Sequence, residues 1–149
     1  MKSVQVKKVA IGIVIVILII GIFLLLLHKS LSPQQTVSRF FTSFNEKDEN
    51  KMNFFVADGL KTATSDVEYL EYVHLLSCNE ATQPEDYEVV RRNWEPDARY
   101  VARVNTSFDI KYADNAPTTG GFSNMTYDWT FYLTKSAKNA PWTIVSYGS

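Results

Sequence analysis

The chain has 149 residues, of which 46% are hydrophobic, with 15 basic residues, 16 acidic residues and one cysteine. A single cysteine excludes an internal disulfide framework. Four of the basic residues and none of the acidic residues lie in the first 30 positions, so the rest of the chain carries 11 basic and 16 acidic residues, a formal charge of −5. This balance excludes the basic surface that nucleic acids require, and it argues against docking on anionic lipid headgroups.

The first predicted element is a transmembrane helix at residues 9–28. The uncharged run VAIGIVIVILIIGIFLLLL occupies residues 9–27, and as a helix its 19 residues would span about 28 Å, close to the hydrocarbon thickness of a bilayer. No small-residue cleavage site follows the run, so we expect an uncleaved single-pass anchor rather than a signal peptide. The alternative is a buried helix of a soluble domain, but the length and the lack of charge favour a span.

Flanking charge predicts the orientation of this anchor. Three lysines precede the span within residues 1–8, whereas only Lys29 follows it closely. The positive-inside rule therefore places residues 1–8 in the cytoplasm and the chain after the span outside the cell membrane. Residues 29–31 form a minimal linker, so we expect residues 32–149 to be an extracytoplasmic domain close to the membrane surface.

Two helices are predicted at the start of this outer domain. Ser32 and Gln35 form a Ser-x-x-Gln capping box, and Pro33 occupies the first helical position. The apolar residues that follow have helical spacing and are Val37, Phe40, Phe41 and Phe44. Asp48 is placed to cap a second, shorter helix, which ends before the turn signal Asp58-Gly59. The apolar residues of this second helix are Met52, Phe55 and Val56.

The spacing of the apolar residues changes in the second half of the chain. Apolar and polar residues alternate through residues 100–112 and again through residues 125–134, which predicts two long, half-buried strands. Residues 142–147 form a further predicted strand, with Pro141 just before it, where a missing N–H group is tolerated. Residues 113–123 contain glycine, proline and polar residues and are predicted to be a loop.

Two segments keep alternative interpretations. Residues 69–78 read YLEYVHLLSC, and their β-branched and aromatic content with apolar residues on both faces favours a central strand. A helix starting near Asp66 is the alternative for this segment. Residues 79–97 are charged and bounded by prolines, which indicates an irregular connection or a short helix.

The order of these elements predicts an α+β fold. Helices followed by hairpin-connected strands place the two helices on one face of a curved, mainly antiparallel sheet of three to four strands. Residues 32–149 are enough for one such core without disulfides. The side chains expected to meet in it are Phe40, Phe41 and Phe44 from the first helix and Phe108, Trp129 and Phe131 from the strands.

The last two strands carry a resemblance to a known family. YDWTFYL at residues 127–133, a polar turn and PWTIVSYG at residues 141–148 follow the capped aromatic helix. Together they resemble the NTF2-like superfamily, which has a cystatin-like α+β cone. They are similar to an uncharacterised extracytoplasmic domain of small membrane-anchored proteins of Gram-positive bacteria. The resemblance implies the cone fold and the extracytoplasmic setting, and it implies no activity.

No pattern in the sequence predicts a catalytic residue, a cofactor or a metal site. Metal-ligand spacings such as HExxH and CxxC are absent, and neither a Walker lysine nor a predicted helix follows Gly120-Gly121. His74 lies among apolar neighbours, which is typical of a hydrogen-bonded core histidine. The resemblance implies that an enzyme of this superfamily would use a carboxylate inside the cone, but Asp109 and Asp128 fall on the polar register of their strands.

A pocket lined by aromatic residues between the first helix and the sheet is the candidate binding site. The side chains expected to line it are Phe40, Phe41, Phe44, His74, Tyr112, Trp129 and Phe131. Alternatively, these aromatic side chains fill the core and pair across strands, leaving no room for a ligand.

These features predict a non-enzymatic, membrane-tethered module that binds a protein partner or a small apolar ligand at the outer surface. One alternative is a structural subunit of a secretion or conjugation channel, because such subunits join one N-terminal span to an NTF2-like domain. The other is a small cone-fold enzyme acting on an apolar ligand. A homo-oligomer is a further alternative, since a disulfide through Cys78 could join two chains. The favoured interpretation of Cys78 is a partly buried thiol.

Overall fold

The computed structural model describes residues 31–61, 64–116 and 125–149. The predicted transmembrane helix at residues 9–28 lies outside these ranges, as does most of the predicted loop at residues 113–123. Within the described ranges, no helix is long and apolar enough to cross a membrane.

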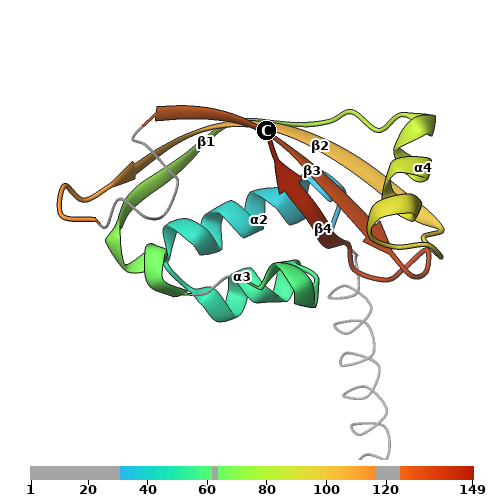
Figure 1. Ribbon diagram of the computed structural model, residues 1–149, viewed down its shortest axis with the longest axis horizontal. Helices are drawn as coiled ribbons and strands as arrows, with labels where there is room; N and C mark the ends of the chain where they lie inside the picture. Colours follow the sequence, from blue (N-terminus) through green and yellow to red (C-terminus); the bar gives the residue numbers. More distant parts are fainter. Residues whose placement is uncertain (1–30, 62–63, 117–124) are drawn as a thin grey trace, which may run out of the picture. The chain divides into compact units, whose positions relative to one another are not determined.

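The described residues confirm the predicted α+β fold, with three α-helices and one antiparallel sheet of four strands in the order β1-β2-β3-β4. In Figure 1 the sheet arches over α2 and α3, while α4 lies at one end of it. The elements are α2 (Pro33–Asn45), α3 (Glu49–Phe55), the 3-10 helices η1 (Asp58–Leu60) and η2 (Thr64–Tyr69), β1 (Leu70–Glu80), α4 (Pro84–Asn93), β2 (Tyr100–Tyr112), β3 (Met125–Lys135) and β4 (Thr143–Gly148).

Helix α2 begins and ends with local hydrogen bonds that its sequence encodes. The predicted capping box is confirmed, because Gln35 N–H donates to Ser32 Oγ at 3.1 Å and Ser32 N–H donates to Gln35 Oε1 at 2.9 Å. After α2 the chain turns at Lys47, whose φ of 58° is left-handed. The Asp48 N–H then donates to the Ser43 carbonyl at 3.0 Å, which completes a Schellman motif at this turn.

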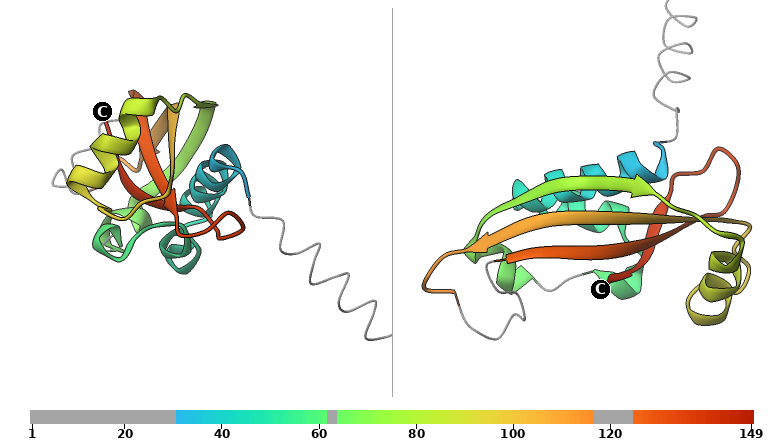
Figure 2. Two further views of the ribbon diagram at one scale, coloured as in Figure 1. Left: turned by 90° about the vertical axis from the view of Figure 1, so that its right-hand side faces the viewer. Right: turned by 90° about the horizontal axis from the view of Figure 1, so that it is seen from above.

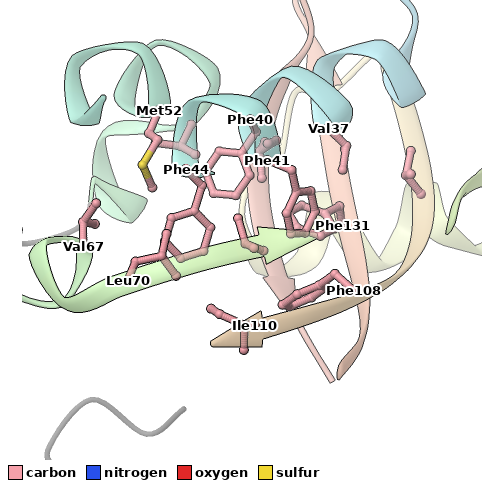
Figure 3. Packing of buried hydrophobic residues seen from close by; sticks show 14 of the residues in the cluster. Val37, Phe40, Phe41, Phe44, Met52, Val67, Leu70, Phe108, Ile110 and Phe131 are labelled. Atoms are coloured by element: carbon pink, nitrogen blue, oxygen red, sulfur yellow. The ribbon is translucent and has the colours of Figure 1, made fainter. Parts of the chain in front are cut away.

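The apolar side of α2 packs into the concave face of the sheet. Phe41 lies 4.8 Å from Phe108 and Phe40 lies 5.9 Å from Phe131, measured between ring centroids. Figure 3 shows these rings pointing from the helix toward the strands. The predicted contact between the first helix and the two long strands is therefore confirmed for these pairs. Met52 of α3 and Val67 of η2 extend the same core.

Strand β1 confirms the favoured interpretation of residues 69–78 but lies at the edge of the sheet, not in its centre. Apolar residues occur on both of its faces because two register shifts interrupt the alternation, one between Leu70 and Tyr72 and a β-bulge between Leu75 and Ser77. Helix α2 runs along this edge (Figure 2). There Asn45 Oδ1 accepts a hydrogen bond from the Val73 N–H at 2.9 Å, so the helix occupies a backbone donor that a neighbouring strand would otherwise use.

Residues 79–97 are predicted to form an irregular connection or a short helix, and the structure has the short helix α4 within them. Its Val90 is buried against Val101 and Val145 of the sheet. Asp86 is only 3% exposed, accepts a hydrogen bond from the Gln83 N–H at 2.6 Å and pairs with Arg103 at 3.2 Å. The Arg103 Nε atom is buried and has no hydrogen-bond partner within the described ranges. The Asp86 carboxylate thus has two roles: it is the counter-ion of Arg103, and it accepts the N-terminal hydrogen bond of α4 from Gln83.

Replacing Lys47 with glycine should stabilise the domain, because glycine adopts a left-handed φ without the steric cost that a Cβ atom causes. We expect Lys47→Gly to raise the free energy of unfolding by about 0.5–1 kcal/mol relative to Lys47→Ala. Chemical denaturation of both variants measures this difference. The alanine variant is the matched control, since it removes the 3.4 Å contact from Lys47 Nζ to the Glu68 carbonyl but keeps the Cβ atom. Equal stability of the two variants would contradict the assignment.

Removing the Asp86 carboxylate should destabilise the domain, because the largely buried Arg103 guanidinium would lose its counter-ion and the Gln83 N–H its acceptor. We expect Asp86→Ala to cost about 2–3 kcal/mol, a figure lowered to allow for the partial exposure of Arg103. Arg103→Met in the same chain should recover part of the loss, since no charge is then left buried. Denaturation midpoints of the single and double variants test this, and purely additive losses would show that the two side chains are not coupled.

Candidate functional site

The interior between α2 and the sheet is filled with side chains around Phe131. Phe131 and Phe108 have no surface that a water molecule can reach. Five of the seven residues expected to line a pocket, Phe40, Phe41, Phe44, Tyr112 and Phe131, are buried here. These five side chains therefore fill the core, as the alternative interpretation expected, and do not line a pocket.

Trp129, the sixth expected residue, is half-buried at the margin of this core. Its ring stacks on Tyr147 of β4 with centroids 5.2 Å apart and an angle of 22° between the planes. Burial raises the pKa of the Tyr147 hydroxyl above its usual value, so this side chain stays neutral at physiological pH. The pair joins β3 to β4 and does not present a charged group to the interior.

His74, the seventh expected residue, does not belong to this set, and its prediction as a core histidine is wrong. It is exposed on β1, and its strand partner is Asp109 on the outer face of the sheet. The neighbours that are apolar in sequence do not surround it, because alternation along the strand turns Val73 and Leu75 inward and His74 outward.

The carboxylates on β2 and β3 lie outside the core, as their polar register predicts. Asp109 Oδ1 accepts a hydrogen bond from Thr126 Oγ at 2.6 Å, and Asp128 is exposed on the same outer face. The residues that the structure describes contain no group of three or more His, Cys, Asp or Glu side chains that could hold a metal ion.

Cys78 is a half-buried thiol that faces α2. Its Sγ atom lies 3.6 Å from the Gln34 carbonyl, to which it donates. Burial raises the pKa of this thiol above its usual value, so the reactive thiolate is scarce at neutral pH. The position fits the favoured interpretation of a partly buried thiol.

A surface groove between α2 and α3 contains a large exposed apolar side chain. We call it the α2–α3 groove; its volume is about 460 Å³ and it is lined by Arg39, Thr42, Ser43, Glu46, Lys51, Phe54 and Phe55. Phe54 is 75% exposed, and its ring meets Phe55 edge-on at 5.5 Å. Phe55 in turn packs on the core, so the exposed Phe54 ring contacts a side chain that is itself held in place.

The two basic side chains of the α2–α3 groove differ in their partners. Lys51 Nζ lies 3.1 Å from Asp48 and 3.2 Å from Glu46, and its hydrogen bonds, first to Asp48 and then to Glu46, raise its pKa. The Arg39 guanidinium has no hydrogen-bond or ion-pair partner among the described residues. The groove therefore offers one free cation and one exposed aromatic ring on neighbouring helices.

A second hollow lies on the outer face of the sheet, where most of the side chains are short and polar. We call it the outer groove; its volume is about 330 Å³ and it is lined by Ser77, Asn79, Asn105, Thr106, Ser107, Asp128, Trp129 and Thr130. Within it, Thr130 Oγ donates to Asn105 Oδ1 at 3.2 Å. Three strands contribute to the outer groove, so its shape depends on the register of the sheet.

Neither groove is predicted from the sequence, although one sequence signal points to the α2–α3 groove. The apolar stripe of the second predicted helix is formed by Met52, Phe55 and Val56. Phe54 falls outside this stripe, so helical spacing predicts that its ring points away from the core. No comparable signal exists for the outer groove, because it depends on pairing between strands that are distant in sequence.

Comparison with known families matches residues 34–148 to a domain of unknown function, DUF4829. The match runs from the second residue of α2 to the last residue of β4 and so includes both grooves. No curated protein and no solved structure matches the chain.

The raised pKa predicts that Cys78 reacts slowly with thiol reagents. At pH 7.5 we expect iodoacetamide to alkylate the folded chain at least about tenfold more slowly than the same chain in denaturant, because both the thiolate fraction and the access are lower. The rate should rise with pH beyond the point at which an ordinary thiol has levelled off. Mass spectrometry of quenched samples gives both rates, and equal rates in the two states would refute the buried setting of this thiol.

Proposed function

Because the chain belongs to the DUF4829 family, to which no function is attached, we propose from its surface that it is a non-enzymatic module that binds another protein through the α2–α3 groove. The observation that carries this proposal is the pairing of the exposed Phe54 ring with the unpartnered Arg39 beside one groove. Aromatic residues and arginine are the side chains most enriched where protein interfaces concentrate their binding energy.

The exposure of Phe54 has an energetic cost that a partner would remove. A fully buried Phe side chain gains about 1.5–3 kcal/mol relative to an exposed one, and three quarters of Phe54 is still exposed to water. Its neighbour Phe55 could anchor the helix alone, since it already packs on the core. A solvent-facing ring on this short helix therefore contributes little to folding and much to an interface.

The shape of the groove favours a protein over a small molecule. Small-molecule sites are concave and bury most of their ligand, whereas this groove lies open between two helices on the surface. Its polar wall consists of Thr42 and Ser43, whose hydroxyls already donate to backbone carbonyls of α2. The free Arg39 then selects a partner segment with a carboxylate next to an apolar side chain.

The uncharged run at residues 9–27 supports a membrane-tethered setting for this module, with the domain outside the cell membrane. The curved antiparallel sheet with α2 in its concave face supports the assignment to an NTF2-like cone. A cone-fold enzyme finds less support, because Asp109, Asp128 and His74 all lie on the outer face, away from the aromatic core.

Photo-crosslinking in intact cells tests the proposal. We expect p-benzoylphenylalanine in place of Phe54 in the full chain to give one discrete adduct with another protein, because the ring sits at the interface. The same substitution at Tyr72, an exposed aromatic residue on β1, is the matched control and should give none.

Reversing the charge of Arg39 distinguishes crosslinking to a specific partner from crosslinking by random collision. Arg39→Glu in the chain labelled at position 54 should abolish the adduct, since it reverses the one unpaired charge of the groove. An adduct of the same yield from position 72, or one that is insensitive to Arg39→Glu, would contradict binding through the α2–α3 groove.

A further inference from the structure

We propose that the outer groove is a separate binding site, which takes a neutral oligosaccharide. The proposal rests on the register, the bulge and the unpaired polar groups of the sheet, and it does not depend on the α2–α3 groove.

The outer groove is built from two rows of short polar side chains that cross three strands. Pairing of β1 with β2 and of β2 with β3 aligns Ser77, Ser107 and Asp128 in one row and Asn79, Asn105 and Thr130 in the next. Neighbouring strands lie about 4.8 Å apart and rows on one face about 6.7 Å apart, so the six side chains cover an area comparable to one or two sugar rings.

The β-bulge of β1 is what turns the first two of these side chains outward. Leu75 pairs with Phe108 and Ser77 pairs with Ser107, so Leu76 is the extra residue of the bulge. In an unbroken register, Leu76 would stand opposite Ser107 on the outer face and Cys78 would follow it there. The bulge replaces a leucine and a cysteine in the groove with a serine and an asparagine, and bulges are over-represented next to functional sites.

Four side chains of the outer groove are unpaired among the described residues, whereas several polar and charged side chains elsewhere on this face are paired. Outside the groove, Lys111 pairs with Glu71 at 2.6 Å and Thr126 donates to Asp109. Inside the groove, four side chains make no hydrogen bond or ion pair with any other described residue. They are Ser77, Asn79, Ser107 and Asp128.

Charge and polarity select the class of ligand. No cation lines the groove and Asp128 is its one charged residue, so an anionic ligand would be repelled. Trp129 is the one large apolar side chain in the lining, so the two polar rows offer an apolar group little surface to contact. The Asp128 carboxylate can accept two hydrogen bonds side by side, whereas the Asn79 amide can donate at its nitrogen and accept at its oxygen. Adjacent hydroxyls of a sugar ring, each a donor and an acceptor, satisfy both patterns.

Titration calorimetry of the purified full chain tests this site, with chitotetraose and maltotetraose as the probes. A detergent without a sugar headgroup avoids competition. We expect at least one probe to bind, and we expect Asp128→Ala and Asn79→Ala each to weaken its binding about tenfold or more, because each removes a paired set of hydrogen bonds. Ser77→Leu should abolish binding by filling the groove.

Asp114→Ala is the matched control, since Asp114 is an exposed carboxylate in the turn after β2 and outside the groove. It should bind as the unaltered chain does. Thermal melts establish that each variant is folded, and the exposed position of Asp128 makes its replacement tolerable. The proposal is overturned if neither probe binds at millimolar concentration, or if the groove variants bind as tightly as the Asp114→Ala control.

Discussion

The packing of the α2 aromatic side chains into the concave face of the sheet is the contact on which the rest of the domain depends. Phe41 meets Phe108 at 4.8 Å and Phe40 meets Phe131 at 5.9 Å, and the strand rings are inaccessible to water. Because aromatic side chains occupy this space, no carboxylate or histidine of β1, β2 or β3 lies within it. Both grooves therefore lie outside this aromatic core.

The helical layer also forms hydrogen bonds with both edge strands of the sheet. Asn45 at the end of α2 accepts a hydrogen bond from Val73 of β1, and the Ala57 N–H after α3 donates to the Ile144 carbonyl of β4 at 2.8 Å. Exposed strand edges invite pairing with other chains, so these contacts at opposite sides of the sheet protect it from edge-to-edge association. Among the described residues, the helix pair and the outer face of the sheet carry the two grooves.

Features set by neighbours along the chain were predictable. The capping box at Ser32, the aromatic stripe of α2 and the alternation along β2 each depend on spacing alone, and each matches the structure. The edge position of β1 was not predictable in this way, whereas the exposure of His74 follows the local alternation of Val73, His74 and Leu75. A bulge in mid-strand broke the alternation, and apolar residues on both faces looked like the mark of a central strand.

The sequence by itself determined the α+β class, the helix on which the core is built and the inward and outward alternation of the two long strands, because periodicity and capping act over a few residues. Only the tertiary structure decided what the surface presents. The exposure of Phe54 beside an unpaired Arg39 depends on how α3 folds against α2, and the polar rows of the outer face depend on which residues of three distant strands stand opposite one another. Pairing over long separations in sequence leaves no local pattern from which it could be deduced.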